Sequence, residues 1–305
     1  MNVLRQCLED YLAVRRALGF KLEREARLLT AFIRCMEAEG ATTVTTERAV
    51  AWATNTKESV NWRSARLAAV RGFARYLQAI EPRTEVPPAG LLPRCSRRAR
   101  PYIYDDAEIS ALITAAHALR LRIGRCTYAT LLGLLAVTGM RVGEAIRLDR
   151  DDVDWEHAVL TIRSTKFGKH REVALHATTA AALLAYSRRR DELLRSPSFF
   201  VSRAGTRLIY NNVDHTFRHL VRCAGLPRIS ARRQPRLHDF RHTFAVRTLL
   251  DWYRDGLDVA ARLSLLSTYL GHVDPSSTYW YLSATPELLA LAAQRLQRVL
   301  GGGCS

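Results

Sequence analysis

Apolar residues in the first eighty positions recur at the three- and four-residue spacing that is typical of amphipathic helices. Two such stripes cover residues 4–18 and 28–36. Thr45 or Thr46 can cap a short third helix, because a threonine hydroxyl accepts a hydrogen bond from a free amide of the first turn. A fourth helix is expected from Trp62 to Ile80. The pattern predicts an all-helical N-terminal domain.

The regular pattern stops over residues 82–101. This stretch contains Pro82, Pro87, Pro88, Gly90 and Pro93, followed by Arg94, Arg97, Arg98 and Arg100. Proline lacks the amide hydrogen that helices and sheets use, and glycine favours turns. The sequence therefore predicts a helical domain over residues 1–81, a basic, proline-rich linker over 82–101 and a second domain over 102–305.

The second domain mixes helical and strand patterns. Asp105 and Glu108 form a capping signature in front of a helix, and residues 127–137 are apolar on all sides, which is typical of a central helix. Residues 159–162 and 171–175 are expected to be short strands that flank a turn. Helical spacing returns after them. The predicted fold class is mainly α with a small β-sheet or hairpin.

The charge of the chain indicates a polyanionic partner. Among 305 residues, 46 are Lys or Arg and 29 are Asp or Glu, so the formal net charge is +17. An excess of this size favours nucleic acid over an anionic membrane surface. The expected fourth helix carries Arg63, Arg66, Arg71 and Arg75 and no carboxylate from Arg63 to Ala79. These arginines are expected to contact phosphates, and a solvated helix face is the alternative.

Cysteine usage and hydropathy exclude several classes of protein. The six cysteines include no CxxC pair, so neither a zinc site nor a disulfide framework is indicated. The longest apolar run, residues 131–137, is too short to span a bilayer, and the N-terminus has no uninterrupted apolar region. We expect a cytoplasmic protein that does not enter the membrane.

Candidate chemistry concentrates between His238 and Tyr281. This stretch holds histidines, an arginine and a tyrosine, and an arginine, an imidazole and a phenol can together hold a phosphate, move a proton and form a covalent intermediate. Upstream, Arg141 directly follows the apolar helix, where a charge requires an anionic partner or access to water. Glu144 could be that partner, and the functional alternative places Arg141 in a phosphate pocket.

No metal site is predicted, although two histidine pairs have the spacing of metal ligands. These pairs are His215 with His219 and His238 with His242. A zinc protease motif needs a glutamate after the first histidine, and neither pair has one.

Three segments resemble the tyrosine recombinase (phage integrase) superfamily, in the order that the family has them. They are Thr-Gly-Met-Arg141-Val-Gly-Glu, Leu-His238-Asp-Phe-Arg241-His-Thr-Phe-Ala, and Leu-Gly-His272 with Tyr281 nine residues later. The resemblance extends from about residue 100 to 285. It implies a C-shaped clamp on double-stranded DNA, made of a helical core-binding domain and a mixed α/β catalytic domain. The basic linker would then lie along the DNA backbone, and a disordered hinge is the alternative.

The resemblance also implies the role of each site residue. Tyr281 is the nucleophile that forms a 3′-phosphotyrosyl link, whereas Tyr279 is structural. Arg141 and Arg241 hold the phosphate oxygens, and His272 donates a hydrogen bond to the phosphate. His238 is the base toward Tyr281. The catalytic lysine matches Lys166, at the turn between the two strands, and Lys169 is the competing candidate. Neither a metal ion nor another cofactor is required.

The implied activity is site-specific DNA recombination or integration, as in the transposition of a mobile element. The C-terminal helix would dock on a neighbouring protomer in a tetramer of this chain or of related recombinase subunits, and folding back on its own chain is the alternative. Two other functions remain open. One is DNA relaxation of the type IB topoisomerase kind, and the other is a non-catalytic DNA-binding regulator on the same scaffold.

Overall fold

A computed structural model describes residues 3–93, 101–163, 170–227, 234–272, 274, 276–283 and 285–301 of the chain. The chain divides into two compact units, Met1–Arg98 and Ala99–Ser305. This division falls inside the predicted linker.

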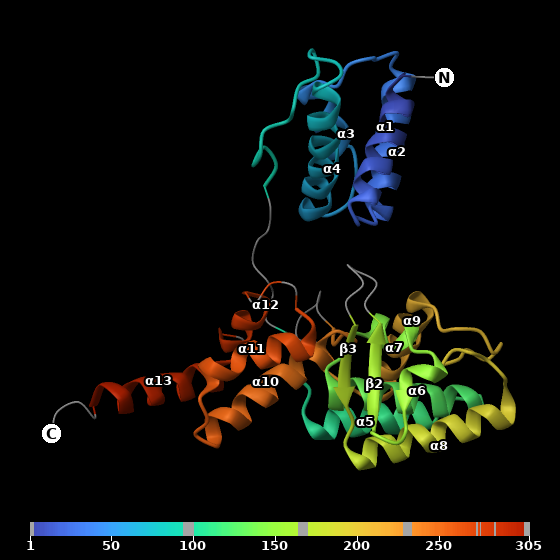
Figure 1. Cartoon of the computed structure of the whole chain (residues 1–305), viewed down its shortest axis with the longest axis vertical. Helices are drawn as coiled ribbons and strands as arrows, with labels where there is room; N and C mark the ends of the chain where they lie inside the picture. The colour runs from blue at the N-terminus through green and yellow to red at the C-terminus, as the bar shows by residue number, and fades with distance from the viewer. Residues whose placement is uncertain are drawn as a thin grey trace. The chain divides into compact units, whose positions relative to one another are not determined.

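The first unit contains the four helices that the pattern predicted. They are α1 (Val3–Ala17), α2 (Glu23–Ala38), α3 (Thr46–Thr54) and α4 (Val60–Gln78) (Figure 1). Thr45 caps α3 and Ser59 caps α4, each by accepting a hydrogen bond from a first-turn amide. The apolar faces of the four helices bury one core, to which Phe32, Phe73 and Leu77 contribute.

Three of the four arginines of α4 hold this unit together. Arg63 donates to a carbonyl in the loop before α4. Arg66 donates to the carbonyl of Trp52 and lies over its ring, with the guanidinium carbon 3.9 Å from the ring centroid. Arg71 donates to two carbonyls in residues 82–93. The first part of the predicted linker is thus bound to the first unit, which the sequence pattern did not indicate.

The second unit is a helical domain with one small sheet. Its helices are α5 (Asp106–His117), α6 (Arg122–Thr138), α7 (Val142–Arg147), α8 (Ala177–Leu193), α9 (Tyr210–Cys223), α10 (Asp239–Arg254), α11 (Val259–Leu270), α12 (Ser276–Tyr279) and α13 (Pro286–Gly301), with the 3-10 turns η1 (Arg150–Asp152) and η2 (Trp280–Ser283). Within the residues described above, no helix is both long and apolar enough to cross a bilayer.

The sheet is antiparallel, with the strand order β1-β2-β3. It consists of β1 (Val153–Asp154), β2 (Val159–Arg163) and β3 (His170–Ala174). The two predicted strands are confirmed, and Leu160 pairs with Val173 between them. The sequence analysis missed β1, because two residues are too few to show the alternation of a strand.

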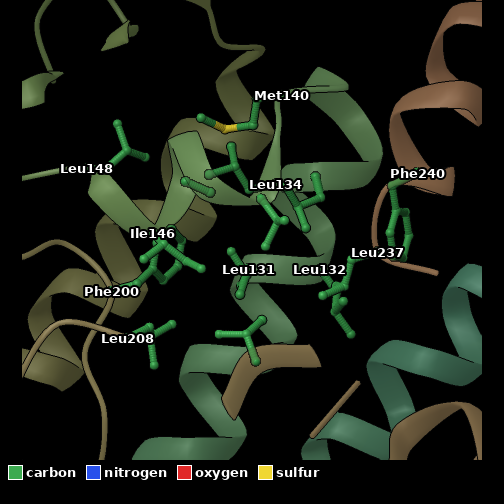
Figure 2. Close-up of a cluster of buried hydrophobic side chains, with 14 of the residues drawn as sticks. Leu131, Leu132, Leu134, Met140, Ile146, Leu148, Phe200, Leu208, Leu237 and Phe240 are labelled. Atoms are coloured by element: carbon green, nitrogen blue, oxygen red, sulfur yellow. The ribbon is translucent and has the colours of Figure 1, made fainter. Parts of the chain in front are cut away.

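The core of the second unit forms around α6, which confirms the central helix. Leu131, Leu132 and Leu134 of α6 pack among side chains from several other segments (Figure 2). These partners include Met140, Ile146, Leu148, Phe200, Leu208, Leu237 and Phe240. A second apolar cluster joins α10 and α11 to the C-terminal segments, and Tyr281 and Leu288 belong to it.

The first turn of the helix α13 packs against its own protomer. Leu288, in its first turn, is fully buried, and Arg254 of α10 donates to Glu287 at 2.6 Å. Leu289 on the next position is 52% exposed. The start of α13 therefore packs against α10 of the same protomer, while part of its apolar surface faces solvent.

We expect that Gly139→Ala destabilises the second unit by about 2 kcal/mol or more. Gly139 ends α6 with φ +59°, and an added Cβ would lie 2.6–2.9 Å from atoms of the Phe244 side chain. Gly133→Ala, inside α6, is the matched control, since its Cβ would meet nothing within 4 Å. It is expected to stabilise by about 0.5–1 kcal/mol, because alanine is the better helix former. Thermal unfolding of both variants measures the difference, and equal effects would contradict the prediction.

Candidate active site

The C-terminal ends of two helices bind the arginine at the centre of the site. The helices α6 and α11 end in glycines with left-handed backbones, Gly139 (φ 59°) and Gly271 (φ 68°). Between these ends lies Arg241, from the first turn of α10, with an exposed fraction of 1%. Its guanidinium donates to the carbonyls of Gly139 at 3.1 Å and Leu270 at 2.5 Å. The carbonyls at a helix C-terminus carry partial negative charge, so they stabilise the buried cation.

Arg241 stays charged at neutral pH. Burial lowers its pKa, and the positive charge of Arg141 lowers it further, to about 10. A pKa of this size still leaves the group protonated at pH 7.

Arg141 has the anionic partner that its position required. It donates to Glu144 Oε1 at 2.8 Å and to the carbonyl of Gly271 at 3.1 Å. Its side chain is nevertheless 39% exposed, so part of the guanidinium faces outward. The two expectations for Arg141 are therefore compatible, because the bond to Glu144 leaves it able to reach an anion.

A third arginine, Arg171 of β3, completes the cluster. It donates to both oxygens of Glu144, at 3.1 Å to Oε1 and 2.7 Å to Oε2. Burial opposes the ionisation of Glu144, but the hydrogen bonds and charge of Arg171, followed by those of Arg141, lower its pKa to about 2. Two guanidinium groups thus bind one carboxylate. With Arg241, whose charge acts on the same group of residues, two positive charges remain for an anion.

The histidines of α10 form a second part of the site. His238 is the residue directly before α10, and it is exposed to solvent. Its ring packs edge to face against the ring of His242, with the centroids 4.7 Å apart. Although part of His238 reaches solvent, the surrounding protein atoms lower its pKa, and Arg241 lowers it further. A neutral His238 at pH 7 can accept a proton.

Tyr281 is buried, with an exposed fraction of 2%. Its hydroxyl is 3.2 Å from Nδ1 of His242, and its ring stacks at 6.1 Å from the ring of His272. The positive charge of Arg241 would stabilise a phenolate at Tyr281, because opposite charges attract. Tyr279, in contrast, is 57% exposed. The two tyrosines that the sequence offered as the nucleophile therefore differ in burial: Tyr281 is buried and Tyr279 is exposed.

His272 follows the end of α11 and contacts Thr278. Its Nδ1 is 2.7 Å from the hydroxyl oxygen of Thr278, which is buried. Burial, followed by the charges of Arg241 and Arg141, lowers the pKa of His272 to about 4. The imidazole is therefore neutral at pH 7.

The structure thus brings together Arg141, His238, Arg241, His272 and Tyr281, which come from three separate segments of the chain. Lys166 and its competitor Lys169 lie outside the described residues. Within the described part of the chain, no group of three or more His, Cys, Asp or Glu side chains could hold a metal ion.

Sequence reasoning missed three residues that contact this set or Glu144, the partner of Arg141. Arg171 belonged to a predicted strand, and the available signal was a charge at a half-buried strand position. His242 was weighed only as a metal ligand, although it lies one helical turn after His238. Thr278 stands six residues after His272 and carried no recognisable signal.

Comparisons with known proteins bear on the whole second unit. The model of the phage integrase family matches residues 103–287. The protein y4rB of Sinorhizobium fredii, which is named as an integrase/recombinase, is 45% identical over 309 residues. The match covers 98% of both chains. The tyrosine recombinase XerD of Caulobacter vibrioides is 29% identical over 235 residues, which cover 75% of this chain and 72% of XerD.

Solved structures share the fold at lower identity. The Tn1549 transposon integrase in complex with transposon right end DNA has a TM-score of 0.69 at 15% identity, over 98% of this chain and 100% of that chain. The XerH site-specific recombinase bound to difH has a TM-score of 0.65 at 19% identity, over 90% of this chain and 77% of that chain. The family match and the length of the 45% identical relative together show that the chain belongs to the phage integrase family, the tyrosine-type site-specific recombinases.

Proposed function

We propose that this chain breaks and rejoins double-stranded DNA at specific sites, with Tyr281 as the nucleophile. The phenol of Tyr281 is buried against His242, and Arg141 and Arg241 bind the adjacent carbonyls of Gly271 and Leu270, directly before His272. Such a set can bind a phosphodiester and attack its phosphorus.

The phosphate would sit between the two arginines. In-line attack places extra negative charge on the non-bridging oxygens, and Arg141 and Arg241 are fixed before the substrate arrives by carbonyls and Glu144. Because the donors are already oriented, they stabilise the developing charge without reorganising. Two net positive charges in the arginine cluster match the charge of the phosphorane.

The covalent step balances without a metal ion or ATP. The oxygen of Tyr281 forms a bond to phosphorus and gives its proton to His238. The bond to the 5′ oxygen breaks, and that oxygen takes a proton from Lys166, a role that rests on the family resemblance alone. The products are a 3′-phosphotyrosyl link and a free 5′ hydroxyl. Attack by the 5′ hydroxyl of a partner strand reverses the step and joins the recombinant strand.

His242 has a different role from His238 in this scheme. It binds the Tyr281 hydroxyl while the phenol is buried, and so it holds the nucleophile until DNA is present. His238, at the exposed start of α10, is the imidazole that a DNA strand reaches first.

His272 would donate a hydrogen bond to the phosphate as a neutral imidazole. If the hydroxyl of Thr278 donates to Nδ1, the ring hydrogen resides on Nε2 and is available to the substrate. In that arrangement Thr278 selects the tautomer of His272.

The names of structural neighbours favour a recombination complex on paired DNA sites. One is a lambda integrase tetramer bound to a Holliday junction, with a TM-score of 0.60, and another is a transposon integrase. We propose a tetramer of this chain, or an assembly with related recombinase subunits, that acts for a mobile element in the cytoplasm. Docking of α13 on a neighbour, the closing of the two units as a clamp on DNA and the role of Lys166 stay predictions.

Two rival functions are separated by one assay. A plasmid with two copies of the bound site reports recombination through exchange of the flanking markers, and it reports topoisomerase activity through loss of supercoils. Marker exchange supports the proposal. Relaxation without exchange favours a type IB topoisomerase, and binding without either change favours a non-catalytic regulator.

We expect that Tyr281→Phe abolishes the covalent protein–DNA adduct, because phenylalanine lacks the attacking oxygen. The substrate is a duplex selected from random DNA by binding to the protein, with a nick near the scissile bond so that the cleaved fragment leaves and the adduct accumulates. Tyr279→Phe is the matched control and should retain the adduct, since Tyr279 is exposed to solvent and Tyr281 is buried. Adduct from Tyr281→Phe, or none from the wild type, would overturn the assignment.

His272 should titrate near pH 4 instead of near pH 6.5, because burial and the nearby arginines disfavour its charged form. Since the ring binds protons more tightly in the unfolded chain, its contribution to stability is complete above about pH 6.5 and is lost as the pH falls toward 4. Imidazole NMR resonances measured against pH test this, with His272→Gln to assign the signal. A His272 ring that titrates at its ordinary value would contradict the burial argument.

A further inference from the structure

Arg171 holds the carboxylate on which Arg141 depends. Its side chain is only 15% exposed, and its two terminal nitrogens each bind one oxygen of Glu144. Paired N–H bonds of this kind fix the orientation of both planar groups. Glu144 uses the same two oxygens for Arg141, whose backbone amide and Nη1 each donate at 2.8 Å.

The charge on Arg171 changes what Arg141 can do. With Arg141 alone, Glu144 would cancel the positive charge that the phosphate needs. With Arg171 bound to the same two oxygens, the carboxylate is neutralised. The triplet of Arg141, Glu144 and Arg171 then keeps one net positive charge. Arg141, which is 39% exposed against 15% for Arg171, is the member of the triplet that faces outward.

Arg171 also contacts the turn that carries His272. A Cβ built on Gly271 would lie 2.9 Å from Nη1 of Arg171 and 3.3 Å from its Cζ. The guanidinium therefore packs directly against the backbone at Gly271, whose carbonyl accepts the bond from Arg141. One side chain of β3 thus contacts two of the groups that hold Arg141 in place.

The place of Arg171 in the chain adds to this connection. It is the second residue of β3, five positions after Lys166 along the chain. The strand β3 contacts α11, the helix that ends at Gly271. Arg171 therefore connects the sheet to the end of α11 through side-chain contacts.

We propose that Arg171 is a positioning residue of the phosphate pocket, which neutralises Glu144 and fixes Arg141 and the Gly271 turn for DNA cleavage. The proposal rests on the proposed function for its catalytic part. The other part, that Arg171 neutralises the carboxylate of Glu144, can be tested without measuring DNA cleavage.

The first test compares adduct formation by four proteins on the nicked duplex, at saturating protein and neutral pH. These are the wild type, Arg171→Gln, Glu144→Gln and the double variant. We expect Arg171→Gln to slow adduct formation about tenfold to a hundredfold, because an unneutralised Glu144 then competes with the phosphate for Arg141. The double variant should regain at least half of that loss on a logarithmic scale, since the competing carboxylate is gone.

A structural role would give the opposite pattern. If Arg171 only stabilises the fold, the two substitutions should add, and the double variant should be slower than Arg171→Gln. That result would overturn the proposal. Arg171→Lys should fall between wild type and Arg171→Gln, because a lysine supplies the charge without the paired hydrogen bonds. Arg150→Gln, which removes an ion pair with Asp191 elsewhere in the same unit, is the matched control and should leave the rate unchanged.

The second test follows the carboxyl carbon of Glu144 by NMR in the full-length protein, with Glu144→Gln to assign the signal. In Arg171→Gln the carboxyl should protonate at clearly higher pH than in the wild type, and in Arg150→Gln it should not. An unchanged titration overturns the proposal whatever the activity. If the titration shifts but the wild type forms no adduct, the proposed function fails while the neutralisation of Glu144 by Arg171 stands.

Discussion

The burial of a charged guanidinium between two helix ends is the constraint on which the second unit depends. Arg241 is almost without solvent contact, and an unpaired charge in that position would cost several kcal/mol. The carbonyls of Gly139 and Leu270 remove that cost by accepting its hydrogen bonds. Because these carbonyls end α6 and α11, one side chain of α10 fixes how three helices meet. The same bonds hold the arginine in place before any substrate binds.

The other features of the pocket follow from this arrangement. Both helices must end sharply to present their carbonyls, and a left-handed glycine does so in each case. Gly271 also lets Arg171 approach the backbone, and Gly139 lets Phe244 pack beside the end of α6. Glu144 then orients Arg141 and is itself held by Arg171. The outcome is a dense set of arginines whose charge exceeds that of the single carboxylate among them, which suits a phosphate between nucleotides.

Much of the fold could be predicted because helical periodicity is a local signal. The four helices of the first unit, the central α6 and the strands β2 and β3 are all visible as spacings of apolar residues. The signal fails where structure depends on distant partners. The two-residue strand β1 exists because β2 lies beside it, and the arginines of α4 bind carbonyls that no spacing rule locates. A basic helix face in the sequence looked available for phosphates, and three of its arginines bind their own unit.

The sequence by itself determined the family and the helical class. It also predicted five candidate site residues that the structure brings together, since motifs such as Leu-Gly-His272 are short and local. Only the tertiary structure decided what those residues touch. It buried Tyr281 against His242 while leaving Tyr279 exposed, and it placed Thr278 on His272 and Arg171 on Glu144. These contacts join positions up to 39 residues apart in sequence. The physical reason is that a charge or a hydrogen bond is set by the atoms around it in space, and those atoms become neighbours only when the chain folds.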